Sequence, residues 1–309
     1  PDEKKLKKDD LFICFSSGSR DHVGKFAYIS ENTSYYAGGF MGIIRVDKCQ
    51  LLPKFFYAIL LHPDIRQNIS DFATGNNINN LSSMLKELKI PLPPLDIQQK
   101  IVDEIDKIDK TVALSEERIN SNKNEIHNLL KALYDGAVQK IRLSDSTVFN
   151  LSIGKRVLNS DLMVNGKIPV YSANVFQPFG YIDKMLISDF SKSSVLWGID
   201  GDWMTNVIAE NIPFYPTDHC GFIRILKENI IAEKYLAFAL NKEGKTLGFS
   251  RSKRASIDRV EGITIPLPEF KDQQKKLFQI EKLEKQIDEA QKAIDASAEL
   301  KNAVLKKYL

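Results

Sequence analysis

The chain contains the same motif twice, 175 residues apart. Ile90-Pro91-Leu92-Pro93 precedes Gln98-Gln99-Lys100 with four residues between them, and Ile265-Pro266-Leu267-Pro268 precedes Gln273-Gln274-Lys275 with the same gap. Self-similarity at so long an offset indicates two copies of one structural unit. A chain of 309 residues has room for two domains of ordinary size.

Each motif opens a stretch in which mostly apolar residues recur at alternating steps of four and three. In the first copy this seam is Ile101, Ile105, Ile108, Val112, Ser115, Ile119, Asn122, Ile126, Leu129 and Leu133. In the second copy it is Ile280, Leu283, Ile287, Ala290, Ile294, Ser297, Lys301, Val304 and Tyr308. The pattern predicts a long helix after each motif, roughly 40 residues and about 60 Å long in the first copy.

The helix boundaries follow from the residues at the ends of the first seam. Pro93-Pro94 cannot lie inside a helix, Asp96 is suited to the N-cap with Gln99 at the third helical position, and Gly136 is placed to end the helix. Two apolar stripes avoid water most simply by packing on each other, and we expect an antiparallel coiled coil within the chain. The alternative is that each helix packs on its own domain or on another protein.

The segments upstream of each helix also match. Gly42–Val46 resembles Gly221–Ile225 as a buried strand, and Lys54–Leu60 resembles Lys234–Leu240 as a short helix. We therefore predict an α+β fold with two repeated globular domains. The predicted boundaries are residues 1–93 for the first domain, 94–142 for the first helix, 143–268 for the second domain and 269–309 for the second helix.

The second domain has a front section, from about Phe149 to Asp183, without an equivalent in the first. Pro1 aligns near residue 183 of the second copy, so we expect the first domain to be truncated at its N-terminal side. A fragment of a longer polypeptide and a naturally shortened domain both fit this alignment.

Composition excludes several other classes of protein. Hydrophobic residues make up 43% of the chain, yet no apolar run is long enough to span a membrane. The first residues do not show the basic-then-apolar pattern of a signal peptide, and we expect none there. The three cysteines, Cys14, Cys49 and Cys220, are far apart and form no CxxC pair, which is typical of free thiols in a reducing cytoplasm. The net charge of +3 discriminates little, so the distribution of charge matters more.

Two variable domains, each followed by an IPLP-type segment, a QQK and a heptad helix, resemble the specificity subunit of a type I restriction–modification system. The resemblance implies two target-recognition domains that each recognise one half of a split double-stranded DNA sequence. It also implies that the paired helices separate the domains and dock two methyltransferase subunits, and it leaves open whether a motor-nuclease subunit joins them. It implies no catalytic residue, cofactor or metal in this chain.

DNA contact requires Lys, Arg, small hydroxyls and backbone amides at phosphates, and Arg, Lys, Asn or Gln at base edges. The segment Ser250–Ser256 is basic, and its counterpart Thr74–Asn80 is rich in Asn. The polar loops Ser16–Lys25 and Trp197–Asn206 are further candidates. The predicted DNA-binding residues are Ser17, Ser19, Arg20, Lys25, Asn76, Asn77, Arg156, Asp200, Arg251, Lys253 and Arg254. Solvated loops and ordinary turns are the alternative interpretation, and Trp203 is expected to be a core residue.

Motifs that suggest catalysis do not hold together. Asn211-Ile212-Pro213-Phe214 is similar to the Asn-Pro-Pro-Phe/Tyr motif of amino-methyltransferases, but its second residue is Ile, and we interpret it as a turn. Pro63-Asp64 with Glu87 and Lys89 matches a nuclease pattern only superficially, because Gly262 and Thr264 take those places in the second copy. The histidines are scattered without metal or triad spacing.

Two alternatives stay open at this point. The chain is also compatible with the C-terminal specificity region of a fused methyltransferase or restriction enzyme. Because the helices carry the clearest pattern, a coiled-coil scaffold that does not bind DNA fits as well.

Overall fold

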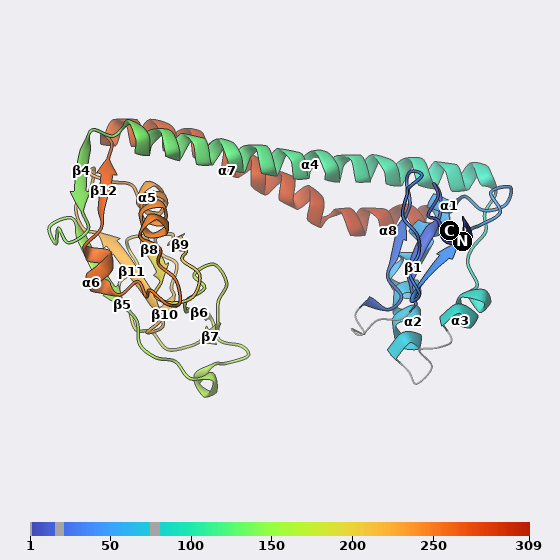
Figure 1. The fold of residues 1–309 in the computed structure, drawn as a ribbon, viewed down its shortest axis with the longest axis horizontal. Helices are drawn as coiled ribbons and strands as arrows, with labels where there is room; N and C mark the ends of the chain where they lie inside the picture. Colours follow the sequence, from blue (N-terminus) through green and yellow to red (C-terminus); the bar gives the residue numbers. More distant parts are fainter. Residues whose placement is uncertain (1, 16–21, 75–80) are drawn as a thin grey trace. The chain divides into compact units, whose positions relative to one another are not determined.

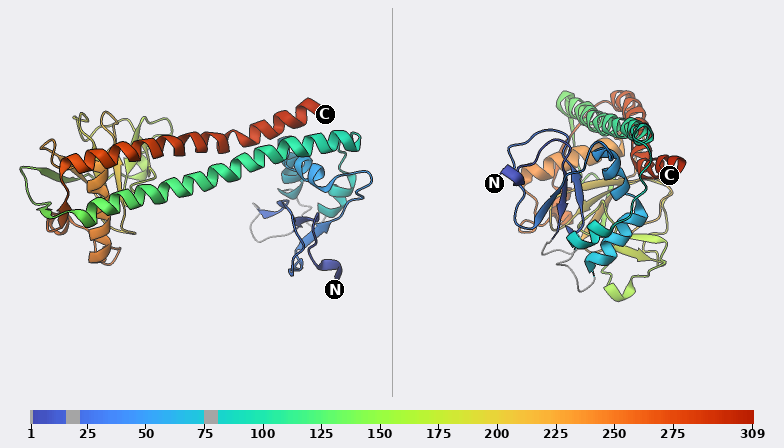
Figure 2. Two further views of the ribbon diagram at one scale, coloured as in Figure 1. Left: turned by 90° about the horizontal axis from the view of Figure 1, so that it is seen from above. Right: turned by 90° about the vertical axis from the view of Figure 1, so that its right-hand side faces the viewer.

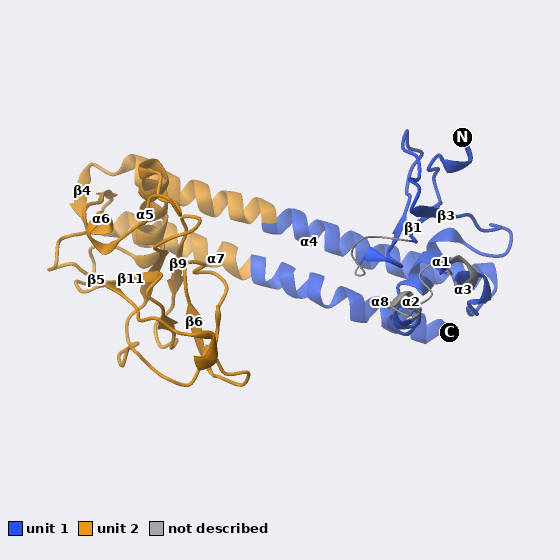
Figure 3. Ribbon diagram, turned by 60° about the horizontal axis from the view of Figure 1, so that its bottom comes forward, with its two compact units in different colours: residues 1–119, 287–309 blue, residues 120–286 orange. Residues whose placement is uncertain are grey.

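The computed structural model describes residues 2–15, 22–74 and 81–309, with side chains placed in these ranges except at 70, 72–74 and 82–84. Its helices and strands are shown in Figure 1 and from two further sides in Figure 2. The chain forms two compact units (Figure 3): unit 1 comprises residues 1–119 and 287–309, and unit 2 comprises residues 120–286. In each unit we call the part outside the long helices the head.

The head of unit 1 is a small antiparallel sheet covered by short helices. Its elements are η1 (Asp2–Lys4), β1 (Leu11–Cys14), β2 (Phe26–Tyr28), β3 (Met41–Ile44), α1 (Pro53–Leu60), α2 (Pro63–Thr74) and α3 (Leu81–Glu87). The strand order is β2-β1-β3. Leu11 and Ile13 alternate along β1 with less buried residues, and both are fully buried against Leu60, Ile69 and Leu81. This period of two is what a strand with one covered face requires.

The head of unit 2 is larger. Its strands are β4 (Gln139–Arg142), β5 (Phe149–Ile153), β6 (Ile168–Tyr171), β7 (Gly180–Ile182), β8 (Ser194–Gly198), β9 (Thr205–Ile208), β10 (Tyr215–Pro216), β11 (Cys220–Ile225) and β12 (Thr264–Leu267). Its helical elements are η4 (Asn159–Asp161), α5 (Glu233–Leu247) and α6 (Ile257–Glu261). The main sheet is antiparallel with the order β5-β11-β8-β9, beside a small sheet β10-β6-β7 and a ribbon β12-β4.

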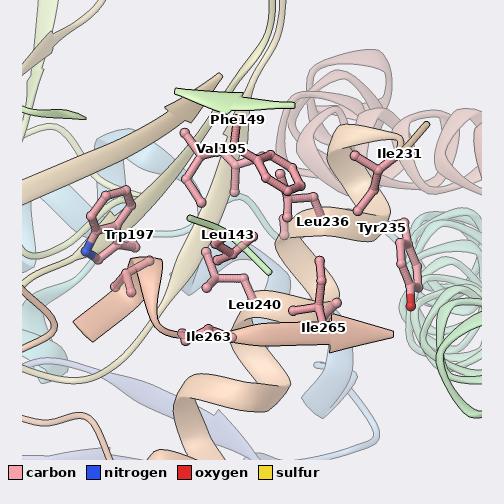
Figure 4. Packing of buried hydrophobic residues seen from close by; sticks show 14 of the residues in the cluster. Leu143, Phe149, Val195, Trp197, Ile231, Tyr235, Leu236, Leu240, Ile263 and Ile265 are labelled. Carbon is pink, nitrogen blue, oxygen red and sulfur yellow. The ribbon is translucent and has the colours of Figure 1, made fainter. Parts of the chain in front are cut away.

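The core of unit 2 lies between the main sheet and α5, with the β4–β12 ribbon at its side. Trp197, Tyr235 and Leu236 are fully buried there, and Figure 4 shows how such side chains from the strands and α5 meet. The Trp197 indole N–H donates to the Ala255 carbonyl oxygen, 2.9 Å away. The largest core side chain thereby also anchors the loop that follows α5.

The two heads share one frame. In unit 1, β1 lies between β2 and β3, and in unit 2, β8 lies between β9 and β11, with α1 and α5 following at matching places. Within the described part of unit 1, no strand occupies the place that β5 has beside β11. Tyr35 and Tyr36 are exposed, whereas Phe214 and Tyr215 at the corresponding positions of unit 2 are buried. Tyr215 pairs with Val170 of β6, a strand of the front section.

The first long helix, α4 (Leu95–Gly136), is confirmed at 42 residues, and the second seam forms α7 (Phe270–Asp295) and α8 (Ser297–Tyr308). In unit 2, the Asn122 side-chain amide donates to Gln286 Oε1 at 3.0 Å. In unit 1, Lys301 pairs with Asp109, and Lys307 Nζ lies 2.8 Å from Glu104 Oε1. Ascending positions on α4 meet descending positions on α7 and α8, so the helices pack antiparallel as predicted (Figure 2).

Every residue of the two predicted seams is buried or half-buried. Three details of the helices differ from the prediction. Helix α4 ends at Gly136, and residues 139–142, which lie within the predicted range 94–142 of the first helix, form β4 instead. Helix α4 begins at Leu95, which places Asp96 in its first turn, where the carboxylate lies 3.3 Å from Lys100 Nζ, rather than at the N-cap. The second helix, predicted as one segment, is divided at Ala296 into α7 and α8, although the Ala296 N–H still donates to the Lys292 carbonyl oxygen at 3.0 Å. Among the described residues, none of the helices is both long and apolar enough to traverse a lipid bilayer.

Candidate nucleic-acid interface

One edge of the unit 2 sheet gathers most of the predicted binding residues of that unit. Gly221 of β11 pairs with Ile153 at the end of β5, and Cys220 pairs with Gly198 at the end of β8. The loops that leave β5 and β8 and the turn that enters β11 therefore lie together. We call this set the basic edge, defined by Arg156, Asp200, His219, Arg251, Lys253, Arg254 and Arg259.

The loop Ser250–Ser256 is held in a fixed conformation. Helix α5 ends at Gly248, whose φ of 73° is the left-handed conformation that glycine adopts without strain. Ser250 and Lys253 then exchange two backbone hydrogen bonds of 3.1 Å. The Ala255 N–H donates to the Ile199 carbonyl oxygen at 2.8 Å. These bonds present the side chains between Ser250 and Ala255 outward as a preformed loop.

The basic side chains of this loop have different partners. Arg251 is exposed, whereas Lys253 Nζ donates to the Leu247 carbonyl oxygen at 2.6 Å and so stabilises the end of α5. Arg254 lies 3.7 Å from Asp200 Oδ2, with slightly more than half of its side chain exposed. Arg251 and Arg254 are therefore the loop cations that are best placed to meet a phosphate or a base edge.

Asp200, itself a predicted binding residue, is engaged by protein groups. His219 Nδ1 lies 3.0 and 2.9 Å from its two carboxylate oxygens, and Arg254 approaches the same carboxylate. A carboxylate would repel a phosphate, so this geometry suits Asp200 to orient Arg254. His219 was not predicted at this place, because its contact with Asp200 depends on the pairing of β8 with β11.

A pocket of about 480 Å³ lies within the basic edge. Its lining residues are Ile153, Ile199, Asp218, Ser252, Arg254, Ser256, Ile257 and Arg259. Ile153 gives the pocket an apolar side, and almost half of this residue is exposed. The Arg259 guanidinium donates to the Arg254 carbonyl oxygen at 2.8 Å. An isoleucine next to arginines and hydroxyls offers both kinds of contact that direct readout of base edges uses. Arg259 and Ile153 were not among the predicted binding residues, because only tertiary packing brings them into this pocket.

Arg156 reaches the same edge through the end of β5. Gly154 N–H donates to the Cys220 carbonyl oxygen at 3.2 Å, and Lys155 N–H donates to the Pro216 carbonyl oxygen at 3.2 Å. A Cβ at Gly154 would overlap the Pro216 carbonyl, so this close approach requires glycine. The exposed residues Lys155 and Arg156 thereby lie beside the turn that contains His219.

In unit 1, five of the six predicted residues lie outside the described residues: Ser17, Ser19, Arg20, Asn76 and Asn77. Lys25 is described and exposed, with its Nζ 3.2 Å from His22 Nδ1. It directly precedes β2, and its carbonyl oxygen accepts from the Cys14 N–H at 3.1 Å. Lys25 is thus next to the end of β1, the strand that corresponds to β8.

The motifs that suggested catalysis are structural. Asn211 lies in the turn between β9 and β10 with a left-handed φ of 61°, and its N–H donates to the Phe190 carbonyl oxygen at 2.7 Å. This agrees with the predicted turn. Burial raises the pKa of the Cys220 thiol, so the thiolate form needed for nucleophilic attack is disfavoured. Within the described ranges, no three His, Cys, Asp or Glu side chains are grouped to hold a metal ion.

Trp203 packs against the core, as predicted, with its N–H donating to the Asn241 carbonyl oxygen at 3.0 Å.

Several specificity subunits of type I restriction enzymes are similar to this chain in sequence. The EcoKI specificity subunit, a type I restriction enzyme subunit of Escherichia coli, is 30% identical over 139 residues, which cover 44% of this chain and 30% of that protein. A putative type I restriction enzyme specificity subunit of Haemophilus influenzae is 24% identical over 294 residues, covering 85% of this chain and 76% of that protein. The chain therefore spans less than a third of the E. coli relative and about three quarters of the H. influenzae one.

The fold is also found among solved structures. The crystal structure of a type I restriction–modification S subunit from M. genitalium matches with a TM-score of 0.59 at 17% identity, covering 99% of this chain and 84% of that one. The sequence model of the type I restriction modification DNA specificity domain matches residues 2–123 and 137–299. Because these two matches contain both copies of the repeat and most of the residues, the chain belongs to the family of the type I restriction modification DNA specificity domain.

Proposed function

We propose that this chain is a DNA-recognition subunit that binds a bipartite double-stranded target and directs methyltransferase subunits to it. The observation that carries the proposal is one frame with two different loops. The β8-β9-β11-α5 frame of unit 2 recurs as β1-β2-β3-α1 in unit 1, while the loop after α5 is basic and its counterpart after α2 is rich in Asn. Conserving the frame while changing the loop is what recognition of two unlike half-sites requires.

In unit 2 the basic edge supplies the contacts. Arg251, Arg254 and Arg156 meet phosphates or guanine edges, because guanidinium groups bind both in a bidentate manner. Lys253 stabilises the loop, and Asp200 with His219 orients Arg254. Ile153 provides an apolar surface of the kind that a thymine methyl group contacts. In unit 1 the corresponding contacts come from Ser17, Ser19, Arg20, Lys25, Asn76 and Asn77.

The rest of the proposed assembly follows from the long helices. Their outward faces are rich in charged residues and provide surfaces on which two methyltransferase subunits dock, with a motor-nuclease subunit as a further component where the system restricts DNA. The chain itself contributes recognition and no catalytic step, and it binds no cofactor. The proposed location is the cytoplasm, where the DNA is.

A second candidate is a coiled-coil scaffold that does not recognise DNA, which the modest net charge of +3 favours. Salt dependence separates the two candidates. A DNA-binding subunit loses affinity linearly in log–log coordinates as salt rises, with a slope of about 0.9 per phosphate contacted. A scaffold binds little DNA at any salt concentration.

The test uses the chain together with its methyltransferase partner and a library of random duplexes. Selection should enrich a split sequence, and enrichment of no sequence would exclude the proposal. Replacing Arg251, Lys253 and Arg254 together by Ala should weaken recognition of one half-site and lower the salt slope by about two. The matched control replaces Lys184, Lys227 and Lys245 by Ala. These lysines are exposed in the same head, and their replacement removes the same amount of positive charge. An equal loss in the control would mean that only the overall charge matters.

A further inference from the structure

The proposed DNA contacts leave one part of the duplicated motif without a role. Of the two adjacent glutamines in each copy, the first is completely buried: Gln98 and Gln273 are both 0% exposed. Gln99 and Gln274, the second ones, are exposed. Each buried glutamine is the fourth residue of its long helix, α4 or α7. Neither belongs to the basic edge.

Gln98 joins three segments of unit 1. Its Oε1 accepts from the Leu52 N–H at 2.8 Å. Its Nε2 donates to the Gln50 carbonyl oxygen at 2.9 Å and to the Pro93 carbonyl oxygen at 2.8 Å. Leu52 is the N-cap of α1 and lacks a side-chain cap, so the amide occupies the place where α1, the loop before it and the start of α4 meet.

Gln273 repeats this arrangement in unit 2. Its Oε1 accepts from the Ala232 N–H at 2.8 Å, and its Nε2 donates to the carbonyl oxygens of Ile230 at 3.0 Å and Pro268 at 2.9 Å. Ala232 is the N-cap of α5, again without a side-chain cap. The three partners of each glutamine thus occupy equivalent positions in the two units.

Two independent copies of the same three bonds indicate a joint with a defined geometry. Apolar contacts are non-directional and tolerate sliding, whereas hydrogen bonds restrict distance and angle. A buried amide that loses these bonds leaves backbone groups unsatisfied, which is costly away from water. The head helix α1 or α5 is packed on its sheet, so fixing its first residue to the long helix fixes the orientation of the head on that helix.

We infer that Gln98 and Gln273 are positioning residues that set the angle between each head and its long helix, and thereby the half-site spacing that the chain accepts. The inference rests on the proposed function, because spacing has meaning only if the two heads bind one duplex. The first Gln of each QQK motif thus sets the orientation of the head, and the second Gln has no part in it.

The experiment measures the affinity of the chain, with its methyltransferase partner, for duplexes with the preferred spacer and with one base pair more or fewer. Gln98→Met and Gln273→Met remove the hydrogen bonds at nearly constant volume. Gln99→Met and Gln274→Met are the matched controls. We expect the wild type and the controls to disfavour the altered spacers by about tenfold, because a rigid reader cannot engage both half-sites when the register is wrong. In the Gln98 and Gln273 variants this ratio should fall to about threefold or less, while binding of an isolated half-site stays within about twofold.

A merely structural role predicts a different result. Val195→Ala, a core change on β8 of unit 2 away from this joint, should lower the melting temperature without changing the spacer ratio. If the glutamine variants lose stability but keep the wild-type ratio, the inference is wrong. If a Met variant does not fold, Gln→Asn at the same position, which is one methylene shorter and cannot make all three bonds, takes its place. Absence of any spacer preference in the wild type would instead refute the proposed function.

Discussion

Single residues in the head of unit 2 are packed with little spare volume, and Gly244 in α5 is an example. A Cβ at this position would overlap the indole ring of Trp203, whose centroid lies 5.0 Å from that of Phe249 with the two rings tilted by 55°. Replacing a helical glycine by alanine gains about 1 kcal/mol from helix propensity. Overpacking a core costs about 1–3 kcal/mol.

The overpacking cost therefore exceeds the gain in propensity, and we expect Gly244→Ala to lower the free energy of unfolding by about 1 kcal/mol. Denaturant titration followed by tryptophan fluorescence measures this change. Gly136→Ala is the control, since no atom lies within 4 Å of a Cβ at that position. A stabilised Gly244→Ala variant would show that the indole has room to move.

Ionisable residues connect the long helices of unit 1, and Glu104 of α4 bonds to two residues of α8. Hydrogen bonds from Lys307 at 2.8 Å and Tyr308 at 2.6 Å lower the pKa of the Glu104 carboxyl from its ordinary value of 4.5. A lowered pKa in the folded state stabilises the protein above the unfolded-state pKa, and this contribution disappears as the pH falls through the folded-state value.

Glu104→Gln should therefore lower the melting temperature at pH 7, and the difference from the wild type should shrink as the pH falls below 4.5. Thermal unfolding across the acidic range measures it. Glu117→Gln, an exposed position on the same helix, removes the same charge as a control. A difference that is constant over pH would assign the effect to packing.

At the scale of elements, the long helices could be predicted from the sequence, whereas the contacts within the basic edge could be predicted only in part. The heptad seam is a local pattern that predicted the long helix, and the prolines and Asp96 before the seam placed its start within two residues of Leu95. Extending the seam back by three residues from Ile101 reaches Gln98, so the phase of the helix already distinguishes the buried glutamine from Gln99. The contacts of Asp200 with His219 and Arg254 depend on strand pairing between distant segments, and no local pattern contains them.

Of the polar residues in the two helix seams, Asn122 is the one that is buried, with 7% of its surface exposed. Its amide donates to Gln286 Oε1 at 3.0 Å, and a polar group of this kind specifies register at a cost in stability. Asn122→Leu should therefore raise the free energy of unfolding by about 1 kcal/mol, since it buries additional apolar surface. Asn122→Ala should lower it. Denaturant unfolding of both variants tests this, and a destabilised Leu variant would show that the Asn–Gln bond outweighs apolar burial.

At the scale of the whole molecule, duplication gives the chain two copies of one frame that carry different loops. The sheet frame, the buried glutamines and the seam recur at matching positions, while the loops at corresponding places differ in charge. A duplicated frame preserves the geometry of attachment, and the divergent loops are free to recognise different sequences. The repeat predicted both the shared frame and the divergent loops, because the two copies can be compared within one chain. It did not predict the interruption of the second helix at Ala296, because the seam keeps its spacing from Ile294 to Ser297 across that point.

The proposed function makes the long helices a ruler, and their length is therefore a variable that can be changed. One additional heptad after Asn122 in α4 and another after Gln286 in α7 preserve the seam, because these two residues face each other. Seven residues add about 10 Å of helix at 1.5 Å per residue. This equals about three base pairs of duplex, since one helical turn of 10–10.5 base pairs spans about 34–36 Å. Selection from random duplexes should return the same two half-sites with a spacer longer by about three base pairs. Insertion of three alanines at each point breaks the heptad and should abolish bipartite binding, whereas an unchanged spacer after the heptad insertion would exclude the ruler.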